Sequence, residues 1–251
     1  MLKQNNFIPC MCNSKLATMK FFLSVLFVLG CLTSCNQESE WIYLFDGETT
    51  DGWRGYNAEV MPPGWTVSEG TLTFNTENRL ESEYIGGRDI IYGNEEFENF
   101  EFYVEWKLGE GGNSGILYHV KEGYNGPYEA SPEYQLIDDL KWGEINSGSL
   151  DNWQKTAADY AMHEADQNLV LIKPSGEWNT TRIIFTPSKV EHWLNGKLVV
   201  SFVPWSDDWN KRKASGKWRN FPDYGKHKKG FIALQDHDSP LSFREIKIRI
   251  L

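Results

Sequence analysis

The chain has 251 residues, of which 40% are hydrophobic, and this is enough apolar material for a folded core. Its net charge is −10, and a surface with such an excess of acids repels a polyanion, so a nucleic acid is excluded as a partner. All four cysteines lie within the first 35 residues, so the rest of the chain has no thiol for a disulfide and depends on that core.

The N-terminal segment has the features of an export signal. Lys20 precedes an apolar run, 21–32, which suits the core of a signal peptide and is too short to cross a bilayer. The run ends in Leu-Thr-Ser-Cys, a pattern typical of a lipoprotein signal, in which Cys35 is lipidated and becomes the mature N-terminus. Met19 is then the expected start, after an upstream extension at 1–18. Three lysines precede Cys35, so processing takes the net charge from −10 to −13.

We therefore expect an exported protein, anchored by lipid in the cell envelope on the periplasmic or surface face of the outer membrane, with no other membrane contact. A buried N-terminal helix is the alternative, but no capping signal or amphipathic period supports it. The chain divides into a signal segment at 1–35, a short polar tether at 36–40 and one folded domain at 41–251.

The folded domain is predicted to consist of strands and turns with little helix. In 99–108, apolar residues alternate with polar ones, which is the period of a half-buried strand. Residues 181–203 predict two strands joined by Asn195-Gly196, the strongest short hairpin signal. Because short strands follow one another without helices between them, we predict an all-β fold: a two-sheet antiparallel sandwich or jelly roll with long loops.

Two longer segments interrupt this series of strands. The first, 140–175, contains Trp142 and Trp153, and the second, 204–229, contains three further tryptophans. Long structured loops inside compact domains are usually functional. Flat aromatic rings stack on the apolar faces of sugar rings, so Trp142 and the other loop tryptophans are candidates for sugar contact, although core packing accounts for most aromatic side chains.

Carboxylates and amides gather at 133–139, Glu-Tyr-Gln-Leu-Ile-Asp-Asp. On a strand, Glu133 and Gln135 point to the same face, so a carboxylate and an amide lie side by side. Such a pair can bind sugar hydroxyls, and the carboxylate can act as a general base. The spacing also resembles the Glu-x-Asp-x-x-Glu motif of laminarinase-like glycosidases, but Gln135 and Asp138 replace two of its acids, which weakens a mechanism with two carboxylates. The alternative is that Glu133 and Asp138 are exposed acids at a strand end.

Histidine is the other candidate for proton transfer, because its ordinary pKa lies near neutral pH. His119 and His163 lie near the polar stretches, and Asp236 and His237 follow a strand. His192 precedes a hairpin and is expected to be structural. For any single histidine, a role without chemistry remains the alternative, and no pair has the spacing of a helical metal site.

Four phrases, in this order, resemble the bacterial 3-keto-disaccharide (3-keto-glycoside) hydrolase family. They are LFDGETTDGW at 44–53, GGNSGILYHV at 111–120, SPEYQLIDD at 131–139 and GFIALQDHDSP at 230–240. The likeness covers nearly all of 41–251 and is weakest at 140–160. The resemblance implies a concanavalin-like β-sandwich that cleaves glycosides already oxidised at carbon 3 of the glucose ring by a separate sugar 3-dehydrogenase.

Such a ketone acidifies the hydrogen on carbon 2, so elimination followed by hydration needs one base, donors for an enolate oxygen and an acid for the leaving group. It does not need the opposed carboxylates of an ordinary glycosidase. Our hypothesis assigns Glu133, with His163 or His119, to proton transfer. The residues expected to hold or border the sugar are Asn113, Gln135, Asp138, Trp142, Asp236 and His237.

A divalent metal held by Asp, Glu and His side chains would polarise the ketone, although the spacing does not require one. Three alternatives stay open at this point, because a fold does not fix a function. They are a non-catalytic, lectin-like carbohydrate-binding lipoprotein, a conventional retaining glucan hydrolase, and an adhesion lipoprotein without an active pocket.

Overall fold

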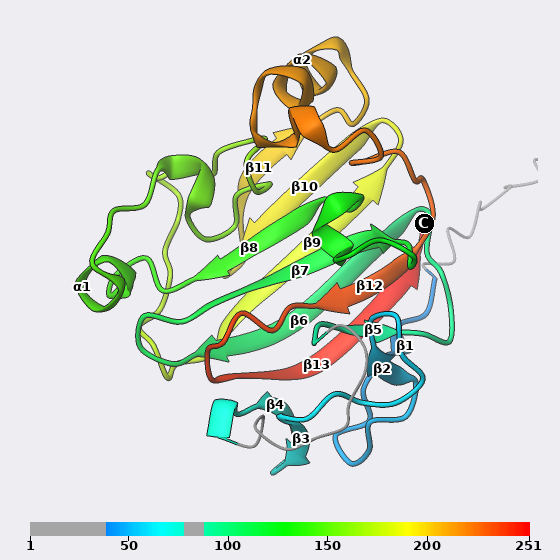
Figure 1. Ribbon diagram of the computed structural model, residues 1–251, viewed down its shortest axis with the longest axis vertical. Coiled ribbons are helices and arrows are strands. Elements are labelled where there is room, and N and C mark those ends of the chain that lie inside the picture. The colour runs from blue at the N-terminus through cyan, green and yellow to red at the C-terminus, as the bar shows by residue number, and fades with distance from the viewer. Residues whose placement is uncertain (1–38, 78–87) are drawn as a thin grey trace, which may run out of the picture. The chain divides into compact units, whose positions relative to one another are not determined.

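The computed structural model describes residues 39–77 and 88–251, and these form two antiparallel sheets with little helix (Figure 1). The larger sheet has the order β11 (Lys197–Phe202), β10 (Lys189–Leu194), β9 (Asn179–Thr186), β6 (Phe100–Leu108), β13 (Leu241–Ile250), β4 (Thr71–Phe74) and β3 (Trp65–Ser68), with β1 (Ile42–Tyr43) also paired to β13. The smaller sheet has the order β2 (Trp53–Gly55), β5 (Ile90–Tyr92), β12 (Phe231–Leu234), β7 (Asn113–Val120) and β8 (Glu133–Ile137). The predicted two-sheet antiparallel sandwich is confirmed.

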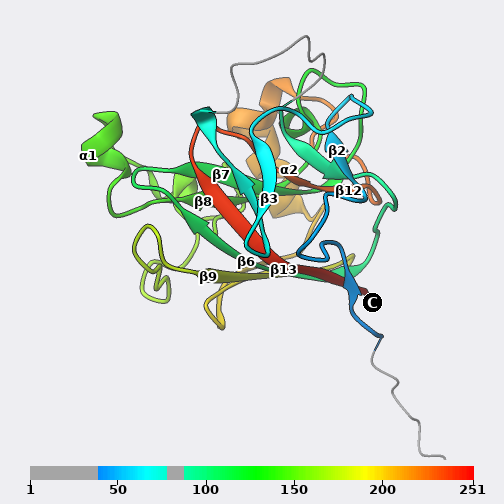
Figure 2. The ribbon, with the colours of Figure 1, turned by 90° about the horizontal axis from the view of Figure 1, so that it is seen from below.

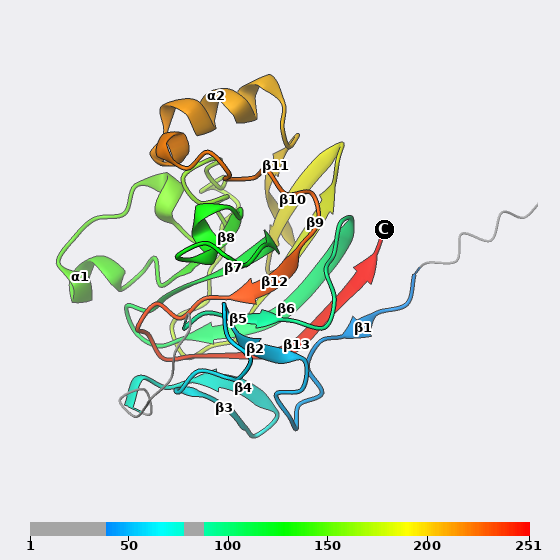
Figure 3. The ribbon, with the colours of Figure 1, turned by 45° about the vertical axis from the view of Figure 1, so that its right-hand side comes forward.

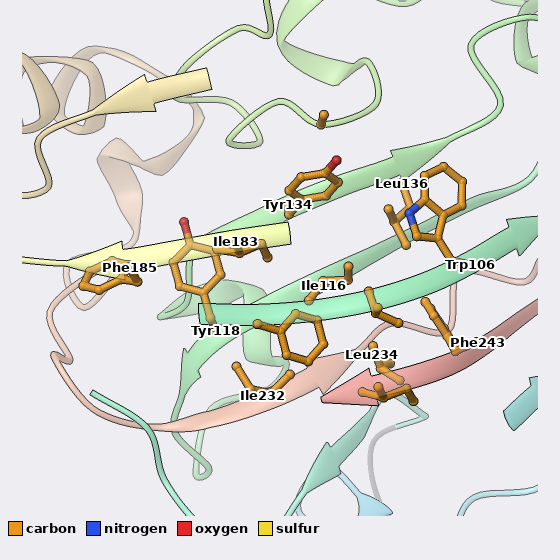
Figure 4. Close-up of a cluster of buried hydrophobic side chains, with 14 of the residues drawn as sticks. Trp106, Ile116, Tyr118, Tyr134, Leu136, Ile183, Phe185, Ile232, Leu234 and Phe243 are labelled. Carbon is orange, nitrogen blue, oxygen red and sulfur yellow. The ribbon is translucent and has the colours of Figure 1, made fainter. Parts of the chain in front are cut away.

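The two sheets pack face to face, and their facing side chains make the core. Figure 2 shows the layers, with β7 and β12 in one and β9 and β13 in the other. The alternation predicted for 99–108 is confirmed in β6, where Phe100, Phe102 and every second residue after them are buried. Figure 4 shows this core, in which Trp106 lies near Leu136. Truncating such a buried ring to alanine costs about 3–5 kcal/mol.

The predicted hairpin at Asn195-Gly196 is also confirmed. β10 and β11 pair antiparallel, and Leu194 lies opposite Lys197 at the turn. Asn195 and Gly196 have φ angles of 46° and 78°. Two consecutive positive φ values are what a type I′ turn requires, and Asn-Gly adopts them at little cost.

The helical elements lie in the two long segments that interrupt the strands. They are α1 (Trp142–Asn146), α2 (Asp207–Ser215) and the 3₁₀ turns η3 (Asn152–Gln154) and η4 (Lys217–Asn220), with a further turn η2 (Pro127–Glu129) before β8. Figures 1 and 3 show both α-helices on the side of β8 and β11, away from β3 and β4. Within the described parts of the chain, neither helix has the length and apolar character needed to cross a membrane. The predicted signal segment with Cys35 lies outside the described residues.

A segment that is not a regular strand covers the outer edge of β8. This segment, 156–160, is called the edge segment below. Ala157 N donates to Gln135 O at 2.9 Å. Tyr160 N donates to Glu133 O at 3.0 Å. These bonds satisfy backbone groups that an edge strand leaves unpaired, and they hold Tyr160 next to Glu133.

Candidate active site

A cavity of about 450 Å³ opens on the outer face of the smaller sheet, a size typical of small-molecule sites. Its polar floor comes from the strands and their ends: Asn113, Glu133, Gln135, Gln235 and Asp236. Its walls and rim come mainly from loops: Tyr56, Arg88, Asp89, Asn125, Gly126, Pro127, Tyr128, Tyr160, Lys217 and His237. Strand alternation explains the floor, because Tyr134 and Leu136 point into the core and leave their neighbours to face outward.

Glu133 contributes a buried carboxyl group to the floor of the cavity. The residue is only 4% exposed, and its side chain makes no hydrogen bond with another described residue. Burial raises the pKa of Glu133 to about 8, with Asp89 and Asp159 adding to the rise and Lys217 opposing it. An unpaired buried carboxyl whose pKa lies near working pH has the properties of a general acid or base.

Gly115 on β7 makes room for this carboxyl. Gly115 pairs with Gln135 across the ladder, two residues from Glu133, which pairs with Leu117. A Cβ atom placed on Gly115 would lie only 2.7 Å from Cδ of Glu133 and would overlap its Oε1. The carboxyl therefore occupies the space that a side chain at Gly115 would fill.

Two amides lie beside the carboxyl on the floor. Gln135 Nε2 donates to Asn113 Oδ1 at 3.2 Å, which orients both side chains. Oε1 of Gln135 and Nδ2 of Asn113 make no hydrogen bond with another described residue. One acceptor and one donor are thus available to the hydroxyl or carbonyl oxygens of a ligand.

Two more carboxyls stand at the other end of the cavity. Asp236 N donates to Asp89 Oδ1 at 2.9 Å, so the two acids lie close together. Burial raises the pKa of Asp89 to about 7, with a contribution from the charge of Asp236, and raises that of Asp236 to about 6. Arg88 opposes both shifts; its Nε lies 4.0 Å from Asp236 Oδ2, an ion pair without a hydrogen bond.

Lys217 is the cation at the rim next to Glu133. Its Nζ lies 4.3 Å from the ring centroid of Tyr160 and 4.8 Å from that of Trp218. It makes no hydrogen bond with a described residue. Partial burial lowers the pKa of Lys217, and the charge of Glu133 opposes this shift. The ammonium is therefore held by aromatic faces and keeps all three donors for a ligand.

A divalent metal in this cavity would need a cluster of oxygen and nitrogen ligands. Within 39–77 and 88–251, no three or more His, Cys, Asp or Glu side chains are arranged to hold a metal ion. The described side chains of the cavity thus offer no such cluster to the divalent metal considered from the sequence.

Comparison with known proteins identifies the family. The model of the 3-keto-alpha-glucoside-1,2-lyase-like domain, which describes 3-keto-disaccharide hydrolases, matches residues 40–249. The chain belongs to the 3-keto-disaccharide hydrolase family. The resemblance noted from its sequence phrases is confirmed.

Individual relatives agree with this assignment. A 3-keto-disaccharide hydrolase of Bacteroides thetaiotaomicron is 33% identical over 232 residues, covering 84% of this chain and 78% of that protein. A crystal structure from Parabacteroides distasonis, described as a candidate glycosyl hydrolase, is 38% identical with a TM-score of 0.76, covering 84% of this chain and 94% of that one. A second structure from that species, described in the same way, is 28% identical with a TM-score of 0.60, covering 84% and 100%.

The structure brings five of the predicted site residues of this family member into one cavity. They are Asn113, Glu133, Gln135, Asp236 and His237. The four others, His119, His163, Asp138 and Trp142, do not line it. The hypothesis that pairs Glu133 with His163 or His119 therefore lacks support in the geometry.

Both histidines have structural partners that explain their positions. His119 is buried, its Nε2 lies 2.9 Å from Glu98 O, and burial lowers its pKa to about 4. The His163 ring stacks on Phe202 with centroids 4.2 Å apart. Its Nδ1 lies 2.8 Å from an oxygen of Asp159. His163 therefore ties the loop after the edge segment to the larger sheet.

Asp138 and Trp142 belong to the start of the first long loop. Asp138 accepts a hydrogen bond from Gly111 N at 2.9 Å, and its other oxygen accepts from Leu140 N at 3.2 Å. These bonds satisfy the carboxylate within the protein. Trp142 lies on α1 and packs beside Gly148. Among the described residues that line the cavity, Tyr56, Tyr128 and Tyr160 provide phenol rings, and none is a tryptophan.

Sequence reasoning missed Arg88, Asp89, Tyr160 and Lys217. Arg88-Asp89 directly precedes the apolar strand β5, and charged residues at a strand end were the available signal. Lys217 carries no such signal, because it lies among other lysines and arginines of the second long loop and only the fold selects it.

Proposed function

We propose that this protein cleaves the glycosidic bond of 3-keto-glucosides, including 3-keto-disaccharides, by elimination followed by hydration. The observation that carries the proposal is the Glu133 carboxyl, which is buried, has no hydrogen-bond partner in the described chain and has a pKa of about 8. The family assignment supports the substrate class, since the relative from Bacteroides thetaiotaomicron bears the name of that reaction. The substrate must come from an enzyme that oxidises the carbon 3 hydroxyl.

The proposed reaction needs no oxidant or reductant. Glu133 takes the proton from carbon 2, and the electron pair of that C–H bond forms an enolate with the carbon 3 carbonyl. Collapse of the enolate restores the ketone, forms a C1–C2 double bond and breaks the C1–O bond, and the departing oxygen takes a proton. Water then adds to carbon 1 while carbon 2 regains a proton, so the net change is hydrolysis.

The strand order supports one direction for the substrate in the cavity. Glu133 stands on β8 at one end of the floor, with Asn113 on the neighbouring strand on one side and the edge segment with Tyr160 on the other. Carbon 2 lies between carbons 1 and 3 of the sugar ring. With carbon 2 at Glu133 and the ketone toward the amides, carbon 1 faces Tyr160 and Lys217.

This orientation assigns the remaining roles. The free Nδ2 of Asn113 donates to the oxygen on carbon 3, where the enolate charge develops, and one such preorganised donor is typically worth ~10²–10³ in kcat. The Lys217 ammonium, with its lowered pKa, is placed to give a proton to the departing oxygen on carbon 1.

The geometry argues against a conventional retaining glycosidase. That mechanism needs a second carboxyl about 5 Å from the first. Asp138 is outside the cavity and saturated by backbone donors. Asp236 follows β12, two strands from β8, which at ~4.8 Å per strand is about 10 Å.

Heavy water provides the test of the reaction. The protein is incubated in D₂O with a 3-keto-disaccharide and, separately, with its unoxidised parent, and the products are followed by NMR. We expect cleavage of the keto sugar alone, with deuterium at carbon 2; the keto sugar without protein is the control for spontaneous exchange. Cleavage without deuterium at carbon 2 contradicts the elimination. Binding of either sugar without cleavage indicates the lectin-like alternative.

The pH dependence follows from the state of Glu133. A base must be deprotonated, so kcat/KM is expected to rise about tenfold per pH unit below a pKa of about 8. It should stop rising above that pKa and fall where Lys217, the proposed acid, loses its proton. Lys217→Met removes the charge that lowers this pKa, so the rising limb should move to higher pH. The measurement is kcat/KM from pH 5 to 10 for both proteins. A profile that is flat in this range would rule out Glu133 as the base.

A further inference from the structure

A second hollow adjoins the cavity beyond Lys217. Its volume is about 350 Å³, and its lining includes Trp153, Glu164, Arg212 and Lys217. Lys217 lines both spaces, and Tyr160 of the cavity wall precedes Ala161 of the hollow. The two spaces therefore meet at the end of the floor where Glu133 stands.

Trp153 offers an aromatic surface in this hollow. Its ring is partly exposed and packs against Tyr160 with centroids 5.5 Å apart and planes 59° apart. Its indole N–H makes no hydrogen bond with a described residue. The two rings thus form a continuous aromatic surface from the cavity into the hollow.

The polar groups of the hollow differ in how many hydrogen bonds they make within the protein. Arg212 donates to Asp208 at 2.7 Å and to Met162 O at 2.9 Å, so its guanidinium is used within the protein. Glu164 is exposed, and the one hydrogen bond that its side chain makes with a described residue is accepted from Asn152 Nδ2 at 3.5 Å, at the limit of such a bond. A hydrogen-bond acceptor beside a free indole donor suits a ligand that is rich in hydroxyl groups.

We infer that this hollow binds the leaving group, and that the leaving group is a second sugar ring stacked on Trp153. The inference rests on the proposed function, in which the bond at carbon 1 points past Tyr160 and Lys217. A substituent that leaves along this line enters the hollow, where Trp153 contacts its apolar face and Glu164 accepts from a hydroxyl. Trp153 and Glu164 are then specificity residues, whereas Glu133 performs the chemistry on any 3-keto-glucoside.

The experiment compares two substrates in two tryptophan variants. Trp153→Ala should lower kcat/KM for a 3-keto-disaccharide about tenfold and leave methyl 3-keto-glucoside, whose leaving group is too small to reach the hollow, within twofold of wild type. Trp142→Ala, a change of another partly exposed tryptophan on the same loop, should alter neither. Trp153→Phe keeps a ring against Tyr160, so its kcat/KM for the 3-keto-disaccharide should lie between the values of Trp153→Ala and wild type. Such an intermediate value would show that the loss in Trp153→Ala does not come from a folding defect. Equal losses on both substrates, or no loss on either, overturn the inference.

A binding measurement separates this inference from the proposed reaction. The unoxidised disaccharide and its methyl glucoside are titrated by calorimetry into Glu133→Gln and into Glu133→Gln/Trp153→Ala. We expect the added Trp153→Ala change to weaken binding of the disaccharide about tenfold and binding of the methyl glucoside less than twofold. Failure of wild type to cleave either keto sugar defeats the proposed function, while equal disaccharide binding by the two variants, or none by either, defeats the second sugar site.

Discussion

Glu133→Gln is expected to lower kcat on a 3-keto-disaccharide by ~10²–10⁴-fold, the usual contribution of a general base. Glutamine keeps the shape of the side chain and cannot take a proton. Because the Glu133 side chain makes no hydrogen bond with a described residue, the substitution breaks none there, and substrate binding should change little. The measurement is kcat and KM by product formation. Retention of full activity would remove Glu133 as the base.

The matched control is Glu191→Gln. Glu191 is also a buried carboxyl, but it lies on β10 of the larger sheet with Lys189 as its ion-pair partner and does not line the cavity. Activity should be unchanged in this variant. A comparable loss in both proteins would show that the effect comes from folding rather than from chemistry.

Glu133→Gln should also change stability in a pH-dependent way. The pKa of Glu133 is about 8 when folded and 4.5 ordinarily, so the charged form is disfavoured by folding. Its contribution to stability is therefore lost as pH rises from about 4.5 to about 8. The variant lacks this loss, so its Tm relative to wild type should increase across that window and then stay constant. This result would distinguish an unpaired carboxyl from one that stabilises the fold.

Gly115→Ala is the second substitution with a large expected effect on activity. The new methyl group would occupy the place of the Glu133 carboxyl, and it is the flexible end of that side chain that must move. The fold should survive, but a catalytic group displaced by about 1 Å can cost ~10²-fold in rate. We expect a loss of that order in kcat with little change in Tm.

A control and a double variant sharpen this result. Gly109→Ala, where the nearest atom to a new Cβ is Pro240 O at 3.3 Å, should leave activity unchanged. Glu133→Asp shortens the acid and withdraws its carboxyl from the new methyl group. Adding Gly115→Ala to Glu133→Asp should therefore lower kcat by a much smaller factor than adding it to wild type. Simple additivity of the two losses would contradict the direct contact.

Much of the fold could be predicted because its signals are local. The alternation in 99–108 and the Asn195-Gly196 turn are set by the period of a strand and by backbone φ, and neither depends on distant residues. The same reasoning placed Glu133 and Gln135 on one face. It also placed Asn113 and Asp236 near strand ends, where they line the cavity.

The rest of the site depends on contacts between segments far apart in the chain. Lys217 reaches Glu133 only because the second long loop folds over Tyr160. The same is true of His163, which looked suited to chemistry by its residue type. Its ring is instead committed to Phe202 and Asp159, and sequence spacing carries no information about such partners.

The edge segment has two structural roles, one at the edge of the sheet and one at the wall of the cavity. Its backbone bonds to β8 close the open side of the smaller sheet, which would otherwise be able to pair with a strand of another molecule. The same few bonds hold Tyr160, the wall between the cavity and the second hollow. Changes in 156–160 that break these bonds are therefore expected to promote aggregation and to disturb the wall of the cavity at the same time.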